Sequence, residues 1–255
     1  MLYVDVRLLR RTGLLEQLAG KPGAEEADYR KFVEASGFDY RRDLDAVLMQ
    51  WRKGTALFVL KGRFDKQRLA LYASGNGGLC ANQFCSLPGS VPERHISFQP
   101  LGRGVMALAA GADAMGAASI GKNASQPGFA PPSAPVWIGL PASSFHAEPD
   151  LPPGLSAFLE ALRGSQRAIL IVETTASGFA LQLNAPCATS EEAKSIVGRL
   201  NKATFRLREL IARSGKAPEA SSPASVLSAG TFQVENSVVH GTWPLSRAFF
   251  EGLGK

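Results

Sequence analysis

Apolar residues form short runs along the chain that predict strands in a recurring order. Residues 2–6 and 136–140 are mostly apolar and have the length of short strands. Apolar runs at residues 46–51 and 56–60 flank a glycine turn, as do those at 168–172 and 179–183, and each pair predicts a β-hairpin. Two more strand pairs are predicted at 95–99 with 105–108 and at 231–235 with 238–243.

Between the predicted strands, apolar residues recur at the spacing of a helix. An apolar stripe at i, i+3, i+4 and i+7 predicts a helix between Pro153 and Gly164, carried by Leu155, Phe158, Leu159 and Leu162. A shorter stripe predicts its counterpart before Gly37, carried by Tyr29, Phe32 and Val33. Short helices are also predicted near residues 113–115 and 245–253.

A second helix follows each hairpin. Asp65 suits the N-cap of the first, which ends near Gly75. Thr189 and Glu192 form a T-x-x-E capping box for the second, which we expect to end before Gly215. Its predicted apolar face consists of Ala193, Ile196, Val197, Leu200, Leu207, Leu210 and Ile211.

The elements therefore occur twice in the order β-α-β-β-α-β-β. The tetrad Phe-Val-Glu-Ala at 32–35 recurs as Phe-Leu-Glu-Ala at 158–161. We predict an α+β fold of two pseudo-repeats, with helices packed on a largely antiparallel and partly ferredoxin-like sheet. The repeats would span residues 1–118 and 136–255, joined by a proline-rich linker at 119–135. A second segment of linker composition occupies residues 215–225.

Composition and charge restrict the function only weakly. The 255 residues are 45% hydrophobic and 20% charged, with a net charge of +6, which is ordinary for a globular protein with a mild preference for acidic partners. No apolar run is long enough for a transmembrane helix. A chain that enters a strand at once is expected to be the mature part of an exported, periplasmic or extracellular protein whose leader was trimmed, or else a cytoplasmic protein.

The three cysteines leave the redox compartment open. Cys80 and Cys85 lie in a stretch rich in Gly, Asn, Ser and Pro, where they either form a short disulfide loop or remain two reduced thiols. Cys187 would then be free beside Pro186.

No group of residues carries the spacing of a catalytic, metal or cofactor site. His95, His146 and His240 are far apart, and the glycine-rich segments at 74–78 and 101–104 lack the flanks of phosphate-binding loops. Asp43 and Asp45, beside Arg41 and Arg42, are interpreted as loop residues in ion pairs. We therefore predict no metal and no cofactor, and the chain is expected not to be an enzyme.

Nucleic-acid binding is also unexpected, although the net charge is positive. The segments at 58–64 and 179–181 lack the alternating aromatic and basic residues of an RNA-recognition strand.

The long second helix carries the most distinctive surface predicted from the sequence. Arg199, Lys202, Arg206 and Arg213 project within one arc, away from the apolar stripe. They form a candidate binding face for an anionic surface or another envelope protein, whereas a solvated helix face is the alternative. Glu209 lies in the same arc and would neutralise part of it.

In its order of elements and its strand-first start, nearly the whole chain resembles uncharacterised bacterial envelope-associated proteins with duplicated helix-plus-hairpin units. The resemblance implies an exported, non-catalytic binding or scaffolding module. A hydrolase or small-ligand carrier with a cleft between the repeats is the alternative. Trp51, Trp137 and Trp243 would line such a cleft, or else pack in the core.

Overall fold

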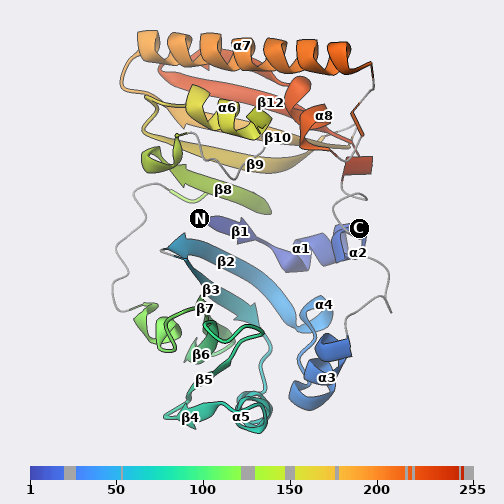
Figure 1. Cartoon of the computed structure of the whole chain (residues 1–255), viewed down its shortest axis with the longest axis vertical. Coiled ribbons are helices and arrows are strands. Elements are labelled where there is room, and N and C mark those ends of the chain that lie inside the picture. The colour runs from blue at the N-terminus through green and yellow to red at the C-terminus, as the bar shows by residue number, and fades with distance from the viewer. Residues whose placement is uncertain are drawn as a thin grey trace. The chain divides into compact units, whose positions relative to one another are not determined.

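The chain forms two compact α+β units. The computed structural model describes residues 1–19, 27–52, 54–121, 130–146, 153–175, 178–215, 218–219, 222–246 and 248–249. The units are Met1–Pro135 and Val136–Lys255 (Figure 1). Within each unit every described strand pairing is antiparallel. In the described part of the chain, no helix combines the length and the apolar character that crossing a membrane requires.

The first unit places seven strands in the order β1-β2-β3-β7-β6-β5-β4. Its elements are β1 (Leu2–Val4), α1 (Val6–Arg11), α2 (Leu14–Ala19), α3 (Ala27–Ser36), α4 (Tyr40–Asp43), β2 (Leu44–Arg52), β3 (Thr55–Gly62), α5 (Lys66–Gly75), β4 (Leu79–Ala81), β5 (Phe84–Pro88), β6 (His95–Gly102), β7 (Val105–Gly111) and the 3-10 helix η1 (Gly116–Ser119).

The two faces of this sheet have different cores. On one face, α5 packs over β5, with Ala73, Cys85 and Leu87 buried at its centre. On the other face, η1 packs on β6 and β7 around Ala107, Ala109 and Ala117, because small side chains let the short helix approach the sheet closely. Leu57 of β3 also packs on the η1 side, whereas Leu60, Phe98 and Leu108 lie on the opposite face.

The second unit places five strands in the order β8-β9-β10-β12-β11. Its elements are β8 (Val136–Pro141), the 3-10 helix η2 (Ala142–Ser144), α6 (Pro153–Ala161), β9 (Arg167–Thr175), β10 (Gly178–Pro186), α7 (Ser190–Ser214), α8 (Pro223–Ser228), β11 (Thr231–Glu235) and β12 (Val238–Leu245).

One face of the long helix α7 contributes to the core of the second unit. It packs against α6, α8, β11 and β12 (Figure 1). Alternate residues of β12 are buried towards the helices, so Val239 and Trp243 are 0% and 4% exposed. Trp243 packs with Phe158 of α6 and Phe232 of β11, with ring centroids 6.3 and 5.3 Å away.

The capping signals read from the sequence are present. The Asp65 side chain accepts hydrogen bonds from the backbone N–H groups of Gln67 and Arg68 at 3.1 and 3.0 Å. Thr189 accepts from the N–H of Glu192, whose carboxylate accepts from the N–H of Ala188. Gly215 ends α7 with a φ of 64°, a left-handed conformation that glycine adopts without strain.

Several elements differ from the sequence-based expectation. The first strand ends at Val4 because Asp5 caps a helix, α1, by accepting from the N–H of Leu8 at 2.8 Å. The stretch around Cys80 forms the β4–β5 hairpin, whose two-residue turn holds Asn82 and Gln83 at positive φ. Part of the predicted linker at 215–225 belongs to α8, where Ser222 is the N-cap and Pro223 the first helical residue.

Two further expectations need correction. The ferredoxin-like description does not fit the strand order, because the first three strands of each unit are successive antiparallel neighbours. The predicted apolar face of α7 is buried only in its first half, at Ala193, Ile196 and Leu200. Leu210 is 63% exposed. Most of the helix expected at 245–253 lies outside the described residues.

Candidate functional site

An apolar hollow of the first unit lies between the α3–α5 helix pair and the sheet. Its volume is about 900 Å³. Its apolar wall comes from Phe32, Phe38, Leu60, Phe64, Leu69, Tyr72, Leu87, Ile96, Phe98, Met106 and Leu108. Volumes of this size and walls of this kind are typical of sites for small apolar or aromatic molecules.

Alternation along the strands directs these side chains to one face. Leu60 on β3 pairs with Met106 on β7, and Leu108 pairs with Phe98 on β6, so all four point to the same side of the sheet. Leu60, Phe98 and Leu108 are only half-buried. The cavity keeps apolar area accessible that a tightly packed helix layer would have covered.

Aromatic rings form the helix side of the cavity. The rings of Phe32 and Tyr72 meet edge to face with centroids 5.0 Å apart, which joins α3 to α5. Phe38 and Phe64 stack at 5.2 Å beside them. Edge-to-face and stacked pairs hold ring orientations, so the wall is shaped before any ligand arrives.

Polar residues gather at the cavity mouth. Asp28 and Lys31 form an exposed ion pair on α3 at 3.4 Å. Asn76, at the end of α5, and Ser90 also line this side and are exposed. The combination of an apolar wall and a polar mouth suits a ligand that is mostly apolar and has one polar end.

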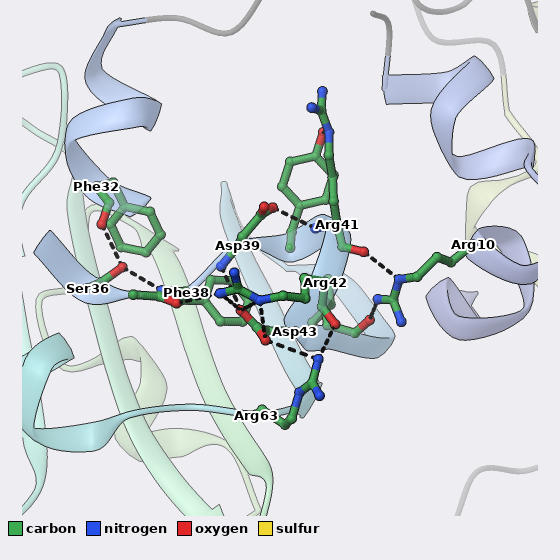
Figure 2. Close-up of polar contacts among 12 residues, drawn as sticks. Arg10, Phe32, Ser36, Phe38, Asp39, Arg41, Arg42, Asp43 and Arg63 are labelled. Carbon is green, nitrogen blue, oxygen red and sulfur yellow. Dashed lines mark hydrogen bonds and ion pairs between the residues drawn. The ribbon is translucent and has the colours of Figure 1, made fainter. Parts of the chain in front are cut away.

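The α3–α4 connection positions Phe38 through a short chain of hydrogen bonds. The Ser36 hydroxyl donates to the carbonyl of Phe32 at 2.6 Å and accepts from the N–H of Phe38 at 3.2 Å (Figure 2). Gly37 between them has a φ of 71°, and a Cβ there would lie 2.6 Å from the guanidinium of Arg68. The left-handed conformation favours glycine at this turn, which leads the chain into Phe38.

The buried carboxylate of Asp43, near Phe38 and Phe64, is the centre of a network of ion pairs and hydrogen bonds. The carboxylate is 2.7 Å from Arg42 Nη2 and 3.2 Å from Arg63 Nη2, and it accepts from the N–H of Asp39 at 3.0 Å (Figure 2). The hydrogen bonds from Arg42 lower the pKa of Asp43. The expected ion pairing of Asp43 is thus present, but on a helix, α4, rather than in a loop.

Two neighbouring contacts hold α4 in place. The Tyr29 hydroxyl donates to Asp39 at 3.1 Å, and burial raises the pKa of Tyr29. Arg10 of α1 donates to the backbone carbonyls of Arg41 and Leu44 (Figure 2). Because α1, α3 and β3 all contact α4, the position of Phe38 depends on residues that are distant in the sequence.

The residues of the predicted basic face have different environments. Arg199 is engaged with the end of α6, where its Nε donates to the carbonyl of Ala161 at 3.0 Å. Arg213 pairs with Glu209 at 3.8 Å. Lys202 and Arg206 line a separate groove of about 590 Å³ between α6 and α7.

The remaining candidates from the sequence are spread over the units. Trp137 and Trp243 are both 4% exposed and are core residues, whereas Trp51 is 62% exposed. Within the described ranges, no group of three His, Cys, Asp or Glu side chains could hold a metal ion. The sequence did not predict the cavity beside α3 and α5, because its lining residues come from six elements and have the composition of an ordinary core.

Cys80 and Cys85 are joined by a disulfide across the β4–β5 hairpin, where they are directly paired. Cys187 is a buried free thiol. All three residues of β4 are exposed, so the bond holds a strand that has little packing of its own.

We expect the variant Cys80→Ser/Cys85→Ser to loosen this hairpin, because the bond restricts the unfolded loop and keeps β4 beside β5. The free energy of unfolding should fall by about 1–2 kcal/mol. Amide hydrogen exchange in β4 should rise more than in β7. Reduced wild-type protein serves as the control and should show the same pattern; unchanged exchange in β4 would contradict the prediction.

Comparisons with known proteins concern the fold alone. No protein-family model and no curated protein matches the chain. Crystal form I of TP0453 aligns with a TM-score of 0.50 and 13% identity, covering 99% of this chain and 91% of that one. Crystal form IV of TP0453 aligns with a TM-score of 0.49 and 12% identity, covering 100% and 92%. At this identity the likeness assigns an architecture and no activity.

Proposed function

We propose that this protein is a non-catalytic binding module of the bacterial cell envelope, built by duplication of one α+β unit. In this proposal the first unit carries a small, mostly apolar molecule in the cavity between α3, α5 and the sheet. The single observation that supports carriage is the 900 Å³ apolar cavity, whose wall is shaped by paired aromatic rings.

The strand order supports the duplication. In unit 1, β1-β2-β3-β7-β6 follow one another across the sheet, and in unit 2, β8-β9-β10-β12-β11 do the same. In both sets the last two strands lie in reverse chain order. A sheet order of this kind is one of many that five strands permit, so its recurrence favours common descent.

A pair of arginines supports it more specifically. Arg68 of α5 donates from Nε to the carbonyl of Ala35 at 3.1 Å, and Arg199 of α7 donates from Nε to the carbonyl of Ala161 at 3.0 Å. These alanines end the two related tetrads, at 32–35 and 158–161. Arg68 of α5 thus binds a carbonyl near the end of α3, and Arg199 of α7 binds the carbonyl at the same tetrad position of α6.

The disulfide supports the assignment to an oxidising compartment. Disulfides are common in exported proteins and rare in the reducing cytoplasm. A paired Cys80 and Cys85 therefore favours a periplasmic or extracellular location over the cytoplasmic alternative.

Binding of a small apolar molecule in the cavity is tested with the uncharged aromatic dye N-phenylnaphthylamine, whose fluorescence rises in apolar surroundings. We expect saturable binding by the full chain with a dissociation constant in the micromolar range. Ala35 is an exposed residue of α3 that lines the cavity, so Ala35→Trp should obstruct it at little cost to the fold. The variant should bind the dye about tenfold more weakly, because the indole occupies space the dye needs.

The control is Ala27→Trp, which places the same side chain at an exposed position of α3 that does not line the cavity. Its dye binding should equal that of the wild type. Equal loss in both variants, or dye fluorescence that never saturates, would reject the cavity as the site. Thermal unfolding of both variants should show that the fold is retained.

A further inference from the structure

The second unit carries an open groove between α6 and α7, at the position that corresponds to the cavity of the first unit. When the sequences are aligned on the tetrads at 32–35 and 158–161, residues of α3 that line the cavity match residues of α6 that line the groove. The pairs are Asp28 with Gly154, Lys31 with Ala157, and Ala35 with Ala161. In the second unit the rings of Phe158, Phe232 and Trp243 pack against one another, with centroids 5.3–6.3 Å apart.

The two helices run in opposite directions along the groove. Gly154, near the start of α6, lies beside Leu207, and Ala161, at its end, contacts Arg199. The lining stretch of α7 from Arg199 to Leu210 is therefore about 16 Å long, which matches three turns of a helix.

Charge is concentrated on the α7 side of the groove. The guanidinium of Arg199 donates hydrogen bonds to the carbonyls of Ala161 and Arg163 and to the Ser195 hydroxyl. Lys202 and Arg206, one turn apart, form no hydrogen bond or ion pair with any other described residue. Glu160 is the one acidic residue of the described lining, and it pairs with Arg163 at 3.9 Å.

Apolar residues continue the groove past these two cations. Leu207 and Leu210 line it at the end beside Gly154. Leu210 is 63% exposed, so its side chain is available to an occupant of the groove. An occupant would cover this area while placing negative charge on Lys202 and Arg206.

We propose that the α6–α7 groove docks an acidic amphipathic helix of a partner protein. Two carboxylates four residues apart would meet Lys202 and Arg206, which are themselves four residues apart, and leucine-like side chains one turn further on would meet Leu207 and Leu210. The groove is open along the helices, so it suits a segment of a macromolecule better than an enclosed small molecule.

The test uses a fluorescein-labelled, alanine-based peptide of about 16 residues, with two glutamates four apart followed by two leucines. Fluorescence anisotropy with the full chain should show saturable binding below ~1 mM. Replacing both glutamates by glutamine should weaken binding about tenfold, because the two charge pairs are lost.

Variants locate the site on the protein. Lys202→Glu/Arg206→Glu should weaken binding about tenfold or more. The control Lys194→Glu/Arg103→Glu makes the same change in net charge at exposed positions outside the groove and should bind as the wild type does. Leu210→Ser should also weaken binding, whereas Phe205→Ser should not, since Phe205 is similarly exposed on α7 but does not line the groove.

Three results would overturn the proposal. The first is an absence of saturable binding, and the second is an equal loss in the groove and control variants. The third is sedimentation with phosphatidylglycerol vesicles that depends on Lys202 and Arg206 without any peptide binding, which would assign the groove to an anionic surface. Circular dichroism of each variant distinguishes loss of binding from loss of fold.

Discussion

Replacing Leu200 by alanine should destabilise the second unit by about 2–5 kcal/mol, the largest effect we expect from a single substitution. Leu200 is 1% exposed, in the middle of the buried stretch of α7. Its truncation leaves a cavity among rigid neighbours, including Ile196, which is also 1% exposed. Urea unfolding followed by circular dichroism measures the change.

Leu210→Ala provides the matched control on the same helix. Leu210 is 63% exposed, so losing its side chain removes little buried area, and the expected change is below about 0.5 kcal/mol. If the two variants were equally destabilised, the second half of α7 would be packed in solution, and the groove proposed for an acidic helix would be closed.

The second large effect is expected at Asp43. Asp43→Asn removes the charge that Arg42 and Arg63 share and weakens the link from α4 to β3, which we expect to cost about 2–3 kcal/mol at neutral pH. Asp45→Asn is the control, because Asp45 pairs with the exposed Arg7 at 3.4 Å and should cost less than about 1 kcal/mol.

The contribution of Asp43 should depend on pH in a defined direction. Its pKa in the folded protein is lowered from the ordinary value of 3.8, chiefly by the hydrogen bonds from Arg42. A carboxylate with a lowered pKa stabilises the fold above its ordinary pKa, and this stabilisation disappears as the pH falls towards the folded pKa. The stability difference between wild type and Asp43→Asn should therefore shrink when unfolding is measured below about pH 4. A constant difference would show that the charge of Asp43 contributes nothing.

The same substitution connects the network to the proposed ligand. Asp43 accepts from the N–H of Asp39, next to Phe38 in the cavity wall. Loosening α4 should let Phe38 move away from Phe64, so the dye affinity of Asp43→Asn should fall while that of Asp45→Asn stays unchanged. The dye titration used for Ala35→Trp measures both.

In the proposed duplication, the helix pairs of the two units have taken on different roles. In both units an arginine donates a hydrogen bond to a carbonyl near the end of a helix, Arg68 to α3 in unit 1 and Arg199 to α6 in unit 2. In unit 2, Phe158 is 5% exposed and completes an aromatic core, whereas Phe32, at the matching tetrad position, lines an open cavity. The partner of Phe158 in that core is Trp243, which is itself 4% exposed.

Local signals in the sequence were sufficient for most elements. Alternating and helical apolar spacing predicted the hairpins β2–β3 and β9–β10 and the helices α3, α5, α6 and α7, because these patterns reflect one-sided burial that holds in almost any fold. Asp65 and Thr189 marked helix starts correctly, since a cap bonds to backbone only three residues away. Asp5 and Ser222 carry the same signal for α1 and α8, within segments predicted as a strand and a linker.

The sequence by itself determined the α+β class and the position of most helices and hairpins, since both follow from spacing between near neighbours. Only the tertiary structure decided the strand order, the engagement of Arg199 with α6, and the exposure of Leu210. It also decided that Phe38, Phe98 and Leu108 surround a cavity rather than fill a core. The physical reason is that a hollow is a property of the distances between elements, and these depend on packing among residues that the chain brings together from far apart.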